Sequence, residues 1–577
     1  MSRQSSGVVR LRAWHLGDWL TLIALLGAAA MFVLQCCWVG HAAIDDAFIT
    51  FSFSKNLALG HGPLYSHGVL AEGYSTFLWM VLVAIPLVLT RGAFPLAAAR
   101  VMAAPFALLL GWAVFRMARA CGASRLTAAL CVLLLSLNTD LAVAYLTGME
   151  TLPYVAVLAF AFALTVQSLV HGRCHKSAPW AALAVALMRI DGFIPAGFLL
   201  GCLFLRDLCQ SSRQPLRSSL RSSLRSWIRG VVVTYAPPLA VYALWFLWRW
   251  HYYGLLLPST YYAKSLISTL MPWRGFQYVT DEVIGGWLWL GLVGWCWLLW
   301  RRRLGAAMLG SFVIIHWTYV VKAGGDWMPF GRFILPTVPL LIVLLGAAGT
   351  DAVVAAFRSK NRLHWLVPCL PLAAGCMMAI HMDHRYLNNA LEDGKVGGSA
   401  EQTTNVEAYL RAAEFLRQLV PVGGRLVTDY GGVFACYTDG ALIEMWGLAN
   451  ATIATRGNTE NVTPIYGKTC AACYPDLQPE YFHVVQPMIR KTSALASTDE
   501  VIKNVWQTDT IGRYINFRAD FVAGRVRRPS TGEALYFLQK RTTVSSLAAR
   551  STGDGFIIEY PFDETANGMA LDAAKNN

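Results

Sequence analysis

The chain has 577 residues, of which 56% are hydrophobic and only 14% are charged. A soluble globular domain carries about 25% charged residues, so this composition excludes a soluble enzyme. The 21 Trp and the lack of a strict sequence repeat exclude disordered, collagen-like and coiled-coil chains. The net charge of +14 lies in the hydrophobic part, because residues 1–381 hold 29 Lys and Arg against 12 Asp and Glu, and residues 382–577 hold 19 against 22. Basic loops beside apolar runs indicate a membrane protein and no nucleic-acid partner.

This distribution predicts a polytopic α-helical transmembrane domain at residues 1–381 and a C-terminal α/β domain outside the cytoplasm at residues 382–577. Eleven apolar runs are candidates for transmembrane helices. They lie near residues 18–39, 97–118, 124–138, 153–170, 178–189, 193–206, 230–250, 284–300, 304–321, 333–349 and 364–381. The first run ends in Cys36-Cys37-Trp38-Val39 without a small-x-small cleavage site, so we expect a retained helix with a cytoplasmic N-terminus.

The apolar run at residues 75–89 decides the orientation of every later span. If it does not cross, all the strongly basic loops lie in the cytoplasm, as the positive-inside rule requires. These loops contain Arg116 with Arg119 and Arg125, Arg173 with Lys176, the arginines of residues 206–229, Arg301 to Arg303, and Arg358 with Lys360 and Arg362. We therefore expect a juxtamembrane or re-entrant helix within a first outward loop at residues 40–96.

This topology gathers acidic and basic side chains at the outward membrane surface. About 20 basic residues and only three acids face the cytoplasm. The outward face holds Asp45, Asp46, Glu72, Asp140, Glu150, Asp191, Asp281, Glu282 and Asp326, with Lys55, Arg189, Lys264, Lys322 and Arg332. Outward loops tolerate acids in any case, but charges at the bilayer edge are costly unless paired or functional.

Such a surface suits a substrate with a lipid tail in the bilayer and a phosphate at its edge. A carboxylate would deprotonate an acceptor hydroxyl, and cations would hold the phosphate as it leaves. Asp45 or Asp46 fits the base, and Arg332, Lys322, Lys264 or Arg189 fits the phosphate clamp. The aromatic loop at residues 248–264 fits either an interfacial aromatic belt or a platform for a sugar or a polyprenyl chain.

Several segments in this order and spacing resemble the AftB-like arabinofuranosyltransferases, which belong to the GT-C superfamily of polyprenyl-phosphate-sugar glycosyltransferases. The matching segments are Ile44 to Gly62 with Asp45-Asp46, Glu72 to Trp79, Thr147 to Thr151, Arg189 to Gly192, Tyr252 to Lys264, Gly325 to Met328 with Arg332-Phe333, and residues 429–450. Two segments depart from the family pattern. Phe51 to Ser54 stands where the family usually has an Arg and a Tyr, and Arg189-Ile190-Asp191 replaces a common Arg-Pro-Asp. Because of these departures, the resemblance does not identify the transferred sugar.

The resemblance implies a GT-C fold and an inverting transfer from a polyprenyl-monophosphate sugar to a glycan, lipid or protein acceptor. It assigns catalysis to Asp45 and Asp46, with Asp45 preferred as the base, and allows Mg²⁺ or Mn²⁺ at this pair. Further roles are implied by position. Donor binding falls to Arg332, Lys264, Lys322, Arg189, Asp326, Tyr253 and Tyr261, and acceptor binding or loop positioning to Glu72, Glu150, Asp191 and His61. The implied location is a bacterial inner membrane.

The outer domain begins near Met382, with a predicted helix at residues 400–419 and strands near residues 425–428, 481–485 and 534–538. Acceptor binding and a purely structural lid both fit it. Cys436, Cys470 and Cys473 lie where oxidation is permitted, so one disulfide among them is favoured over a metal site that lacks a fourth ligand.

Three other functions compete. A transporter or flippase would place charges near the bilayer midplane, often in repeated halves, whereas these charges lie at one edge. A ligase or polymerase of the O-antigen type would use a lipid-diphosphate donor. A non-catalytic scaffold would leave Asp45-Asp46 without a role.

Overall fold

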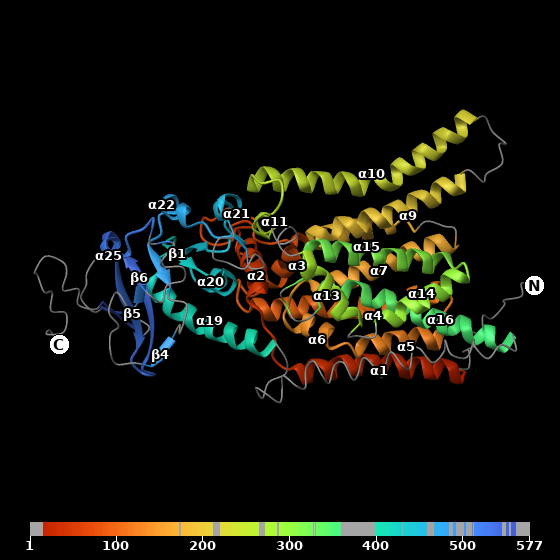
Figure 1. Ribbon diagram of the computed structural model, residues 1–577, viewed down its shortest axis with the longest axis horizontal. Helices are drawn as coiled ribbons and strands as arrows, with labels where there is room; N and C mark the ends of the chain where they lie inside the picture. The colour runs from red at the N-terminus through yellow and green to blue at the C-terminus, as the bar shows by residue number, and fades with distance from the viewer. Residues whose placement is uncertain are drawn as a thin grey trace, which may run out of the picture.

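The computed structural model describes most of the chain in two connected parts, a helical bundle and a sheet domain (Figure 1). The described residues are 15–171, 175–211, 220–264, 272–284, 288–326, 328, 331–358, 399–429, 431–458, 467–483, 489–491, 501–502, 511, 513–544, 550–552 and 555–560. The predicted span at residues 364–381 and the predicted domain boundary at residues 381/382 lie outside them.

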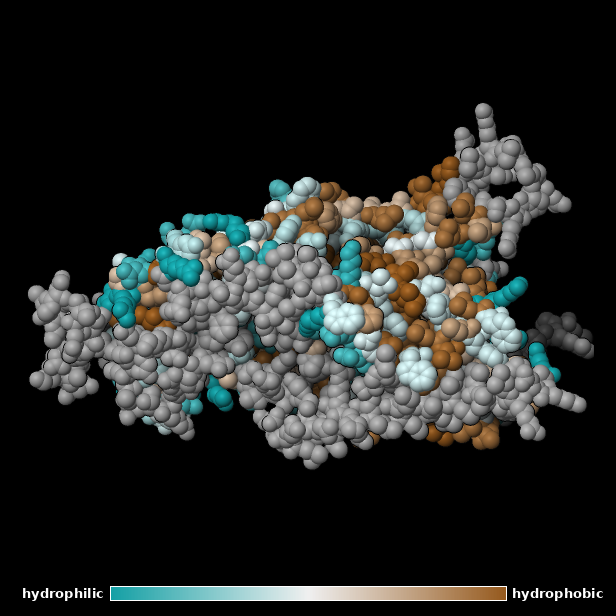
Figure 2. Space-filling view, in the orientation of Figure 1, coloured by the Kyte–Doolittle hydropathy of each residue, from teal (hydrophilic) through white to brown (hydrophobic). Residues whose placement is uncertain are grey.

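The bundle is built from long apolar helices joined by short connections. Its elements are α1 (Leu16–Val39), α2 (Asp45–Ala58), α3 (Phe77–Leu89), α4 (Pro95–Ala120), α5 (Arg125–Ser136), α6 (Thr139–Leu146), α7 (Thr151–His171), α8 (Ala178–Met188), η1 (Ile190–Gly192), α9 (Phe193–Ser211), α10 (Leu220–Tyr253), α11 (Ser259–Lys264), α13 (Pro272–Ile284), α14 (Leu288–Trp300), α15 (Leu304–Ala323), η2 (Leu335–Thr337) and α16 (Val338–Arg358). Hydrophobic side chains cover much of the visible surface of this part (Figure 2).

Within the described ranges, seven helices are long and apolar enough to cross a membrane, or nine if the two bent pairs α5 with α6 and α13 with α14 each form one span. Ten of the eleven predicted spans coincide with these helices or with the shorter apolar helix α8. Helix α3 has 13 residues, which is too short for a straight span of about 20 residues. The prediction of a polytopic helical membrane protein with a C-terminal sheet is confirmed.

The two ends of the bundle carry different charges. At one end Arg125 pairs with Asp18, and Arg301 and Arg303 both pair with Asp351. A hydrogen bond of 3.1 Å between the side chains of Thr350 and Thr127 brings these pairs together. The opposite end holds the connections after α1, before α7, after α8 and after α15, where the predicted site residues lie.

The outer domain is a mixed sheet with helices. Its elements are α19 (Ser399–Leu419), β1 (Arg425–Thr428), α20 (Gly431–Tyr437), β2 (Ala441–Glu444), α21 (Ala451–Arg456), η5 (Ala471–Cys473), α22 (Tyr474–Leu477), β3 (Tyr481–His483), β4 (Ile489–Lys491), α25 (Phe517–Asp520), β5 (Phe521–Arg528), β6 (Glu533–Lys540), η6 (Arg541–Thr543), β7 (Arg550–Ser551) and β8 (Ile557–Glu559). The strand order is β2-β1-β3-β6-β5-β8-β7, and β4 also pairs with β6. Strand β1 is parallel to β2 and β3, and β6 is antiparallel to β3 and β5.

Alternating residues of these strands face two different cores, as the two-residue period of a strand requires. Leu426 and Leu442 belong to a core that continues through α19 and α20 into the helical bundle. Their neighbours Val427 and Ile443 belong to a second core, which contains Cys470 and Cys473. The first core joins the outer domain to the bundle, with α2, α11, α20 and α21 gathered at the junction (Figure 1).

Candidate active site

Asp45 is the first residue of α2 and connects the first loop to the outer domain. Its two carboxylate oxygens accept hydrogen bonds from the backbone N–H groups of Gly432 (3.0 Å) and Val433 (2.8 Å). Burial raises the pKa of Asp45 to about 6, against the opposing effect of these two hydrogen bonds. A carboxylate with a pKa near neutrality is suited to general base catalysis.

Helices α2 and α20 pack side by side in the same direction. Near the other end of this contact, Lys55 Nζ donates a hydrogen bond of 2.5 Å to the carbonyl oxygen of Cys436. An acid at the N-terminus of α20 and a cation at its C-terminus both match the helix dipole. The thiol of Cys436 donates to the carbonyl oxygen of Phe48. The outer domain is therefore fixed to the first loop at both ends of α20.

Asp46 and Lys264 differ from Asp45 because neither forms a hydrogen bond or a close ion pair with any residue in the described ranges. Both side chains are half-buried. Lys264 ends α11, which packs against α21 of the outer domain. Burial lowers the pKa of Lys264, whereas the negative charge of Asp46, and more weakly those of Asp326 and Glu444, raise it. This ammonium group is desolvated and held among acids without a direct partner.

Buried Arg189 and half-buried Arg332 flank the ring of Phe333, which lies with Arg332 in the connection between α15 and α16. Arg332 pairs with Asp326 at 2.5 Å, and Arg189 pairs with Asp191 at 2.9 Å and with Glu150 at 3.2 Å. Both guanidinium carbons lie 5.2 Å from the centre of the Phe333 ring. The Tyr319 hydroxyl also donates to Asp191. These ion pairs hold both guanidinium groups in fixed positions.

Two other predicted site residues, Glu72 and Tyr253, form contacts that hold the first loop in place. Glu72 receives hydrogen bonds of 2.5 to 3.0 Å from Arg249, whose side chain is fully buried. The Tyr253 hydroxyl donates to the carbonyl oxygen of Pro63 at 2.8 Å. Glu72 and Tyr253 thus tie the first loop to the end of α10 and to the segment that follows it.

The remaining predicted side chains lie at the surface. Tyr261 is 56% exposed, and His61 and Lys322 are also exposed. Lys322 is therefore less well placed for a desolvated phosphate than Lys264. Sequence reasoning missed Arg249, Phe333 and Glu444. An arginine inside an apolar run was a signal for a buried acidic partner. Phe333 and Glu444 lay within segments that resemble the arabinofuranosyltransferases, but no role was assigned to either side chain.

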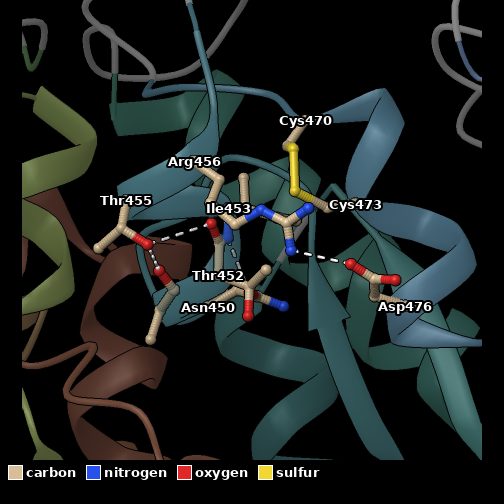
Figure 3. Close-up of a disulfide and its surroundings, with 9 residues drawn as sticks. Asn450, Thr452, Ile453, Thr455, Arg456, Cys470, Cys473 and Asp476 are labelled. Carbon is tan, nitrogen blue, oxygen red and sulfur yellow. Dashed lines mark hydrogen bonds and ion pairs between the residues drawn. A yellow bond between two sulfur atoms is a disulfide. The ribbon is translucent and has the colours of Figure 1, made fainter.

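The cysteines of the outer domain separate into two kinds. Cys470 and Cys473 form a disulfide at η5, and Cys436 is a buried thiol. Figure 3 shows the disulfide beside the ion pair of Arg456 with Asp476 (2.8 Å), which links α21 to α22. The Asn450 side chain caps the start of α21 through the backbone N–H of Ile453. These contacts support the segment that packs against α11.

The acid pair is a poor ligand set for the predicted Mg²⁺ or Mn²⁺ ion. Each oxygen of Asp45 already accepts a backbone N–H, and Asp46 faces the positive charge of Lys264. In the part of the chain that the structure describes, no three His, Cys, Asp or Glu side chains are grouped to hold a metal. Mg²⁺ often takes only one or two protein carboxylates beside water and phosphate oxygens. Here one carboxylate is hydrogen-bonded on both oxygens and the other faces a cation, so this pair does not fit the ion.

Part of the chain is similar in sequence to a known protein. The chain is 32% identical over 138 residues to a terminal β-(1→2)-arabinofuranosyltransferase from Corynebacterium glutamicum. The predicted resemblance is confirmed. The match covers 20% of this chain and about a fifth (19%) of that relative's length. No family model matches the chain.

Two solved structures show a weaker likeness in three dimensions. ArnT from Cupriavidus metallidurans, crystallised with undecaprenyl phosphate, has a TM-score of 0.49 and 13% identity over 81% of this chain and 94% of its own. The oligosaccharyltransferase AglB from Archaeoglobus fulgidus, in complex with an inhibitory peptide and a dolichol-phosphate, has a TM-score of 0.48 and 12% identity over 92% of this chain and 75% of its own. Both TM-scores are below 0.5, so neither structure assigns an activity to this chain.

Proposed function

We propose that the protein is a membrane glycosyltransferase that moves a sugar from a polyprenyl monophosphate to an acceptor outside the cytoplasm, with inversion. The observation that carries this proposal is the cluster of Asp45, Asp46, Lys264, Arg189 and Arg332, whose charges act on one another at one end of an apolar bundle, where the outer domain packs. A lipid donor can lie with its chain against the helices and its phosphate among these cations. The match to an arabinofuranosyltransferase supports the same reaction type and makes arabinofuranose the first sugar to test.

In the proposed reaction, Asp45 accepts the proton of an acceptor hydroxyl while that oxygen attacks the anomeric carbon. The bond between this carbon and the phosphate oxygen breaks, and the polyprenyl phosphate leaves with the bonding electrons. Attack from the face opposite the phosphate inverts the anomeric configuration. The leaving phosphate gains negative charge, so cations fixed near it stabilise the transition state more than the ground state.

The cations contribute in different ways. Arg332 and Arg189 are held by Asp326, Asp191 and Glu150, so their positions are set before substrate binds. Lys264 has no close partner in the described ranges, so its ammonium can approach a phosphate without breaking an existing ion pair. We therefore assign the direct phosphate contact to Lys264 and Arg332. Asp46 balances the charge of this pair when no donor is bound.

The test is a transfer assay with the purified protein and a panel of synthetic polyprenyl-phosphate sugars. We expect release of polyprenyl monophosphate with at least one pentose or hexose donor in the presence of a glycan or lipid acceptor. The competing flippase activity is measured with the protein reconstituted in liposomes. Movement of an intact lipid-linked sugar across the membrane, without cleavage of its glycosidic bond, would replace the transferase proposal by a flippase.

A further inference from the structure

Two adjacent glycines of the outer domain, Gly431 and Gly432, lie between two carboxyl-bearing residues from different parts of the molecule. A methyl group on Gly432 would lie 1.9 Å from the backbone oxygen of Asp45. A methyl group on Gly431 would lie 2.7 Å from Cγ of Glu444 and 2.4 Å from the hydroxyl of Tyr65. The Tyr65 hydroxyl donates to the carbonyl oxygen of Gly431 at 2.6 Å. Only glycine allows this close approach on both sides.

Glu444 is the last residue of β2 and is 1% exposed. Its two carboxylate oxygens accept hydrogen bonds from the backbone N–H groups of Trp446 (2.8 Å) and Ala449 (3.1 Å). Glu444 and half-buried Asp45 thus share two features: both oxygens of each carboxylate accept backbone N–H groups, and each residue lies against the same glycine pair. None of the steps proposed above uses it.

We propose that the outer domain completes the site of the proposed transferase: Gly431-Gly432 holds the Asp45 carboxylate in place, and Glu444 is a positioning residue whose charge acts on Asp45 across this dipeptide. This inference rests on the proposed function. The base would then be oriented and tuned by the domain that covers it, so correct docking of that domain becomes a condition for proton transfer.

The titratable groups that act on Asp45 and Glu444 lie on several of the elements packed around them. Asp45 faces Asp46 on α2, Cys436 on α20, Tyr65 in the first loop and Glu444 on β2. Glu444 faces Asp45, Tyr65, Tyr474 on α22 and Lys264 on α11. Burial is the main cause that raises the pKa of Glu444, to about 7, and the charge of Asp45 adds to it. The two carboxylates repel each other when both are ionised.

The first experiment is the pH dependence of kcat/KM for Glu444→Gln. This change keeps the shape of the side chain and removes its charge, and its amide NH2 also loses the hydrogen bond from either Trp446 or Ala449. Loss of a neighbouring negative charge makes Asp45 easier to ionise. We therefore expect the acidic limb of the kcat/KM profile to move to lower pH by about half a unit or more. The control is Glu480→Gln, because Glu480 lies at the opposite end of the parallel strands, beside Arg425. If the acidic limb of the profile stayed in place in a folded, active Glu444→Gln protein, Glu444 would serve only to hold the backbone of residues 446–449.

The second experiment needs no activity and measures melting temperatures at pH 5 and pH 8. Both acids are largely protonated at pH 5 and largely ionised at pH 8. The effect of Glu444→Gln on the melting temperature should therefore be more favourable at pH 8 than at pH 5, and this difference is the gain. Part of this gain is relief of repulsion with Asp45, so we expect a smaller gain in the Asp45→Asn background. Equal gains in both backgrounds would overturn the inference.

The two experiments separate this inference from the proposed function. A wild-type protein without transferase activity would contradict the function, and the melting temperatures would then still report whether Glu444 and Asp45 are coupled. An active wild-type protein whose Glu444→Gln variant keeps its pH profile would contradict the coupling alone.

Discussion

At the scale of single residues, the acid pair divides into two different groups. Asp45 has a backbone donor on each oxygen, whereas Asp46 lies near Lys264 without a close partner in the described ranges. The adjacent positions are thus not equivalent. In the proposed mechanism, Asp45 is therefore a fixed base and Asp46 is a charge that organises the cations.

The raised pKa of Asp45 gives a pH prediction for activity. Its value of about 6 means that the base is increasingly protonated below pH 6, so kcat/KM should fall about tenfold per pH unit there. A pH profile with a saturating acceptor checks this, and a flat profile down to pH 4.5 would remove Asp45 from the role of base.

The raised pKa of Asp45 also affects folding stability, which should fall as the pH rises, whereas activity should increase. A carboxyl group with a raised pKa binds its proton more tightly when folded, so its contribution to stability is present below its ordinary pKa near 4 and is lost as the pH rises through 6. Asp45→Asn should therefore reduce the loss of melting temperature between pH 4.5 and pH 7. Identical slopes in wild type and variant would contradict the assignment.

Arg332 gives a second prediction at this scale. Arg332→Lys keeps a positive charge but loses the planar geometry that pairs with Asp326, so we expect partial activity. Arg332→Ala removes the charge and leaves Asp326 without this partner, so turnover should fall by about 10² or more. Steady-state kinetics test both, with Arg301→Ala at the other end of the bundle as the control. Normal turnover by a folded Arg332→Ala would move the phosphate site toward Arg189.

At the scale of elements, the contact between α2 and α20 joins the two parts of the molecule. Gly432→Ala would place a methyl group against the Asp45 backbone and push these helices apart. We expect kcat to fall about tenfold or more, while the KM for the donor changes little because the cations lie on other elements.

The matched control for this variant is Gly230→Ala, since a methyl group at Gly230 meets no atom within 4 Å. Kinetics and melting temperatures of both variants distinguish a displaced Asp45 from an unfolded protein. If a well-folded Gly432→Ala kept full kcat, the contact between α2 and α20 would have no part in catalysis.

The elements themselves were largely predictable from the sequence, but their contacts were not. Apolar runs located helices such as α4, α7 and α15, because burial in a bilayer requires long apolar segments. The partnership of Asp45 with Gly432 joins positions 387 residues apart, and that of Glu72 with Arg249 joins positions 177 apart. Local periodicity carries no information about such pairs. The motifs therefore indicated which residues gather at the site, while the role of Glu444 required the fold.

At the scale of the whole molecule, the charge distribution predicts how the protein lies in the membrane. A reporter that is active only outside the cytoplasm should be active when fused after Gly398 and silent when fused after Ser219, because the positive-inside rule predicts that the basic end of the bundle faces the cytoplasm. A silent fusion after Gly398 together with an active one after Ser219 would reverse the topology and place the site in the cytoplasm.

The central claim is that the acid pair of the first loop drives sugar transfer from a polyprenyl monophosphate. The most direct measurement is single-turnover release of polyprenyl phosphate from a labelled donor by wild type, Asp45→Asn and Asp46→Asn, with donor binding measured in parallel. We predict that all three bind donor and that Asp45→Asn releases it about 10² times more slowly or worse, with a smaller loss for Asp46→Asn. Wild-type release rates in both variants, with one sugar still transferred per phosphate released, would contradict the account.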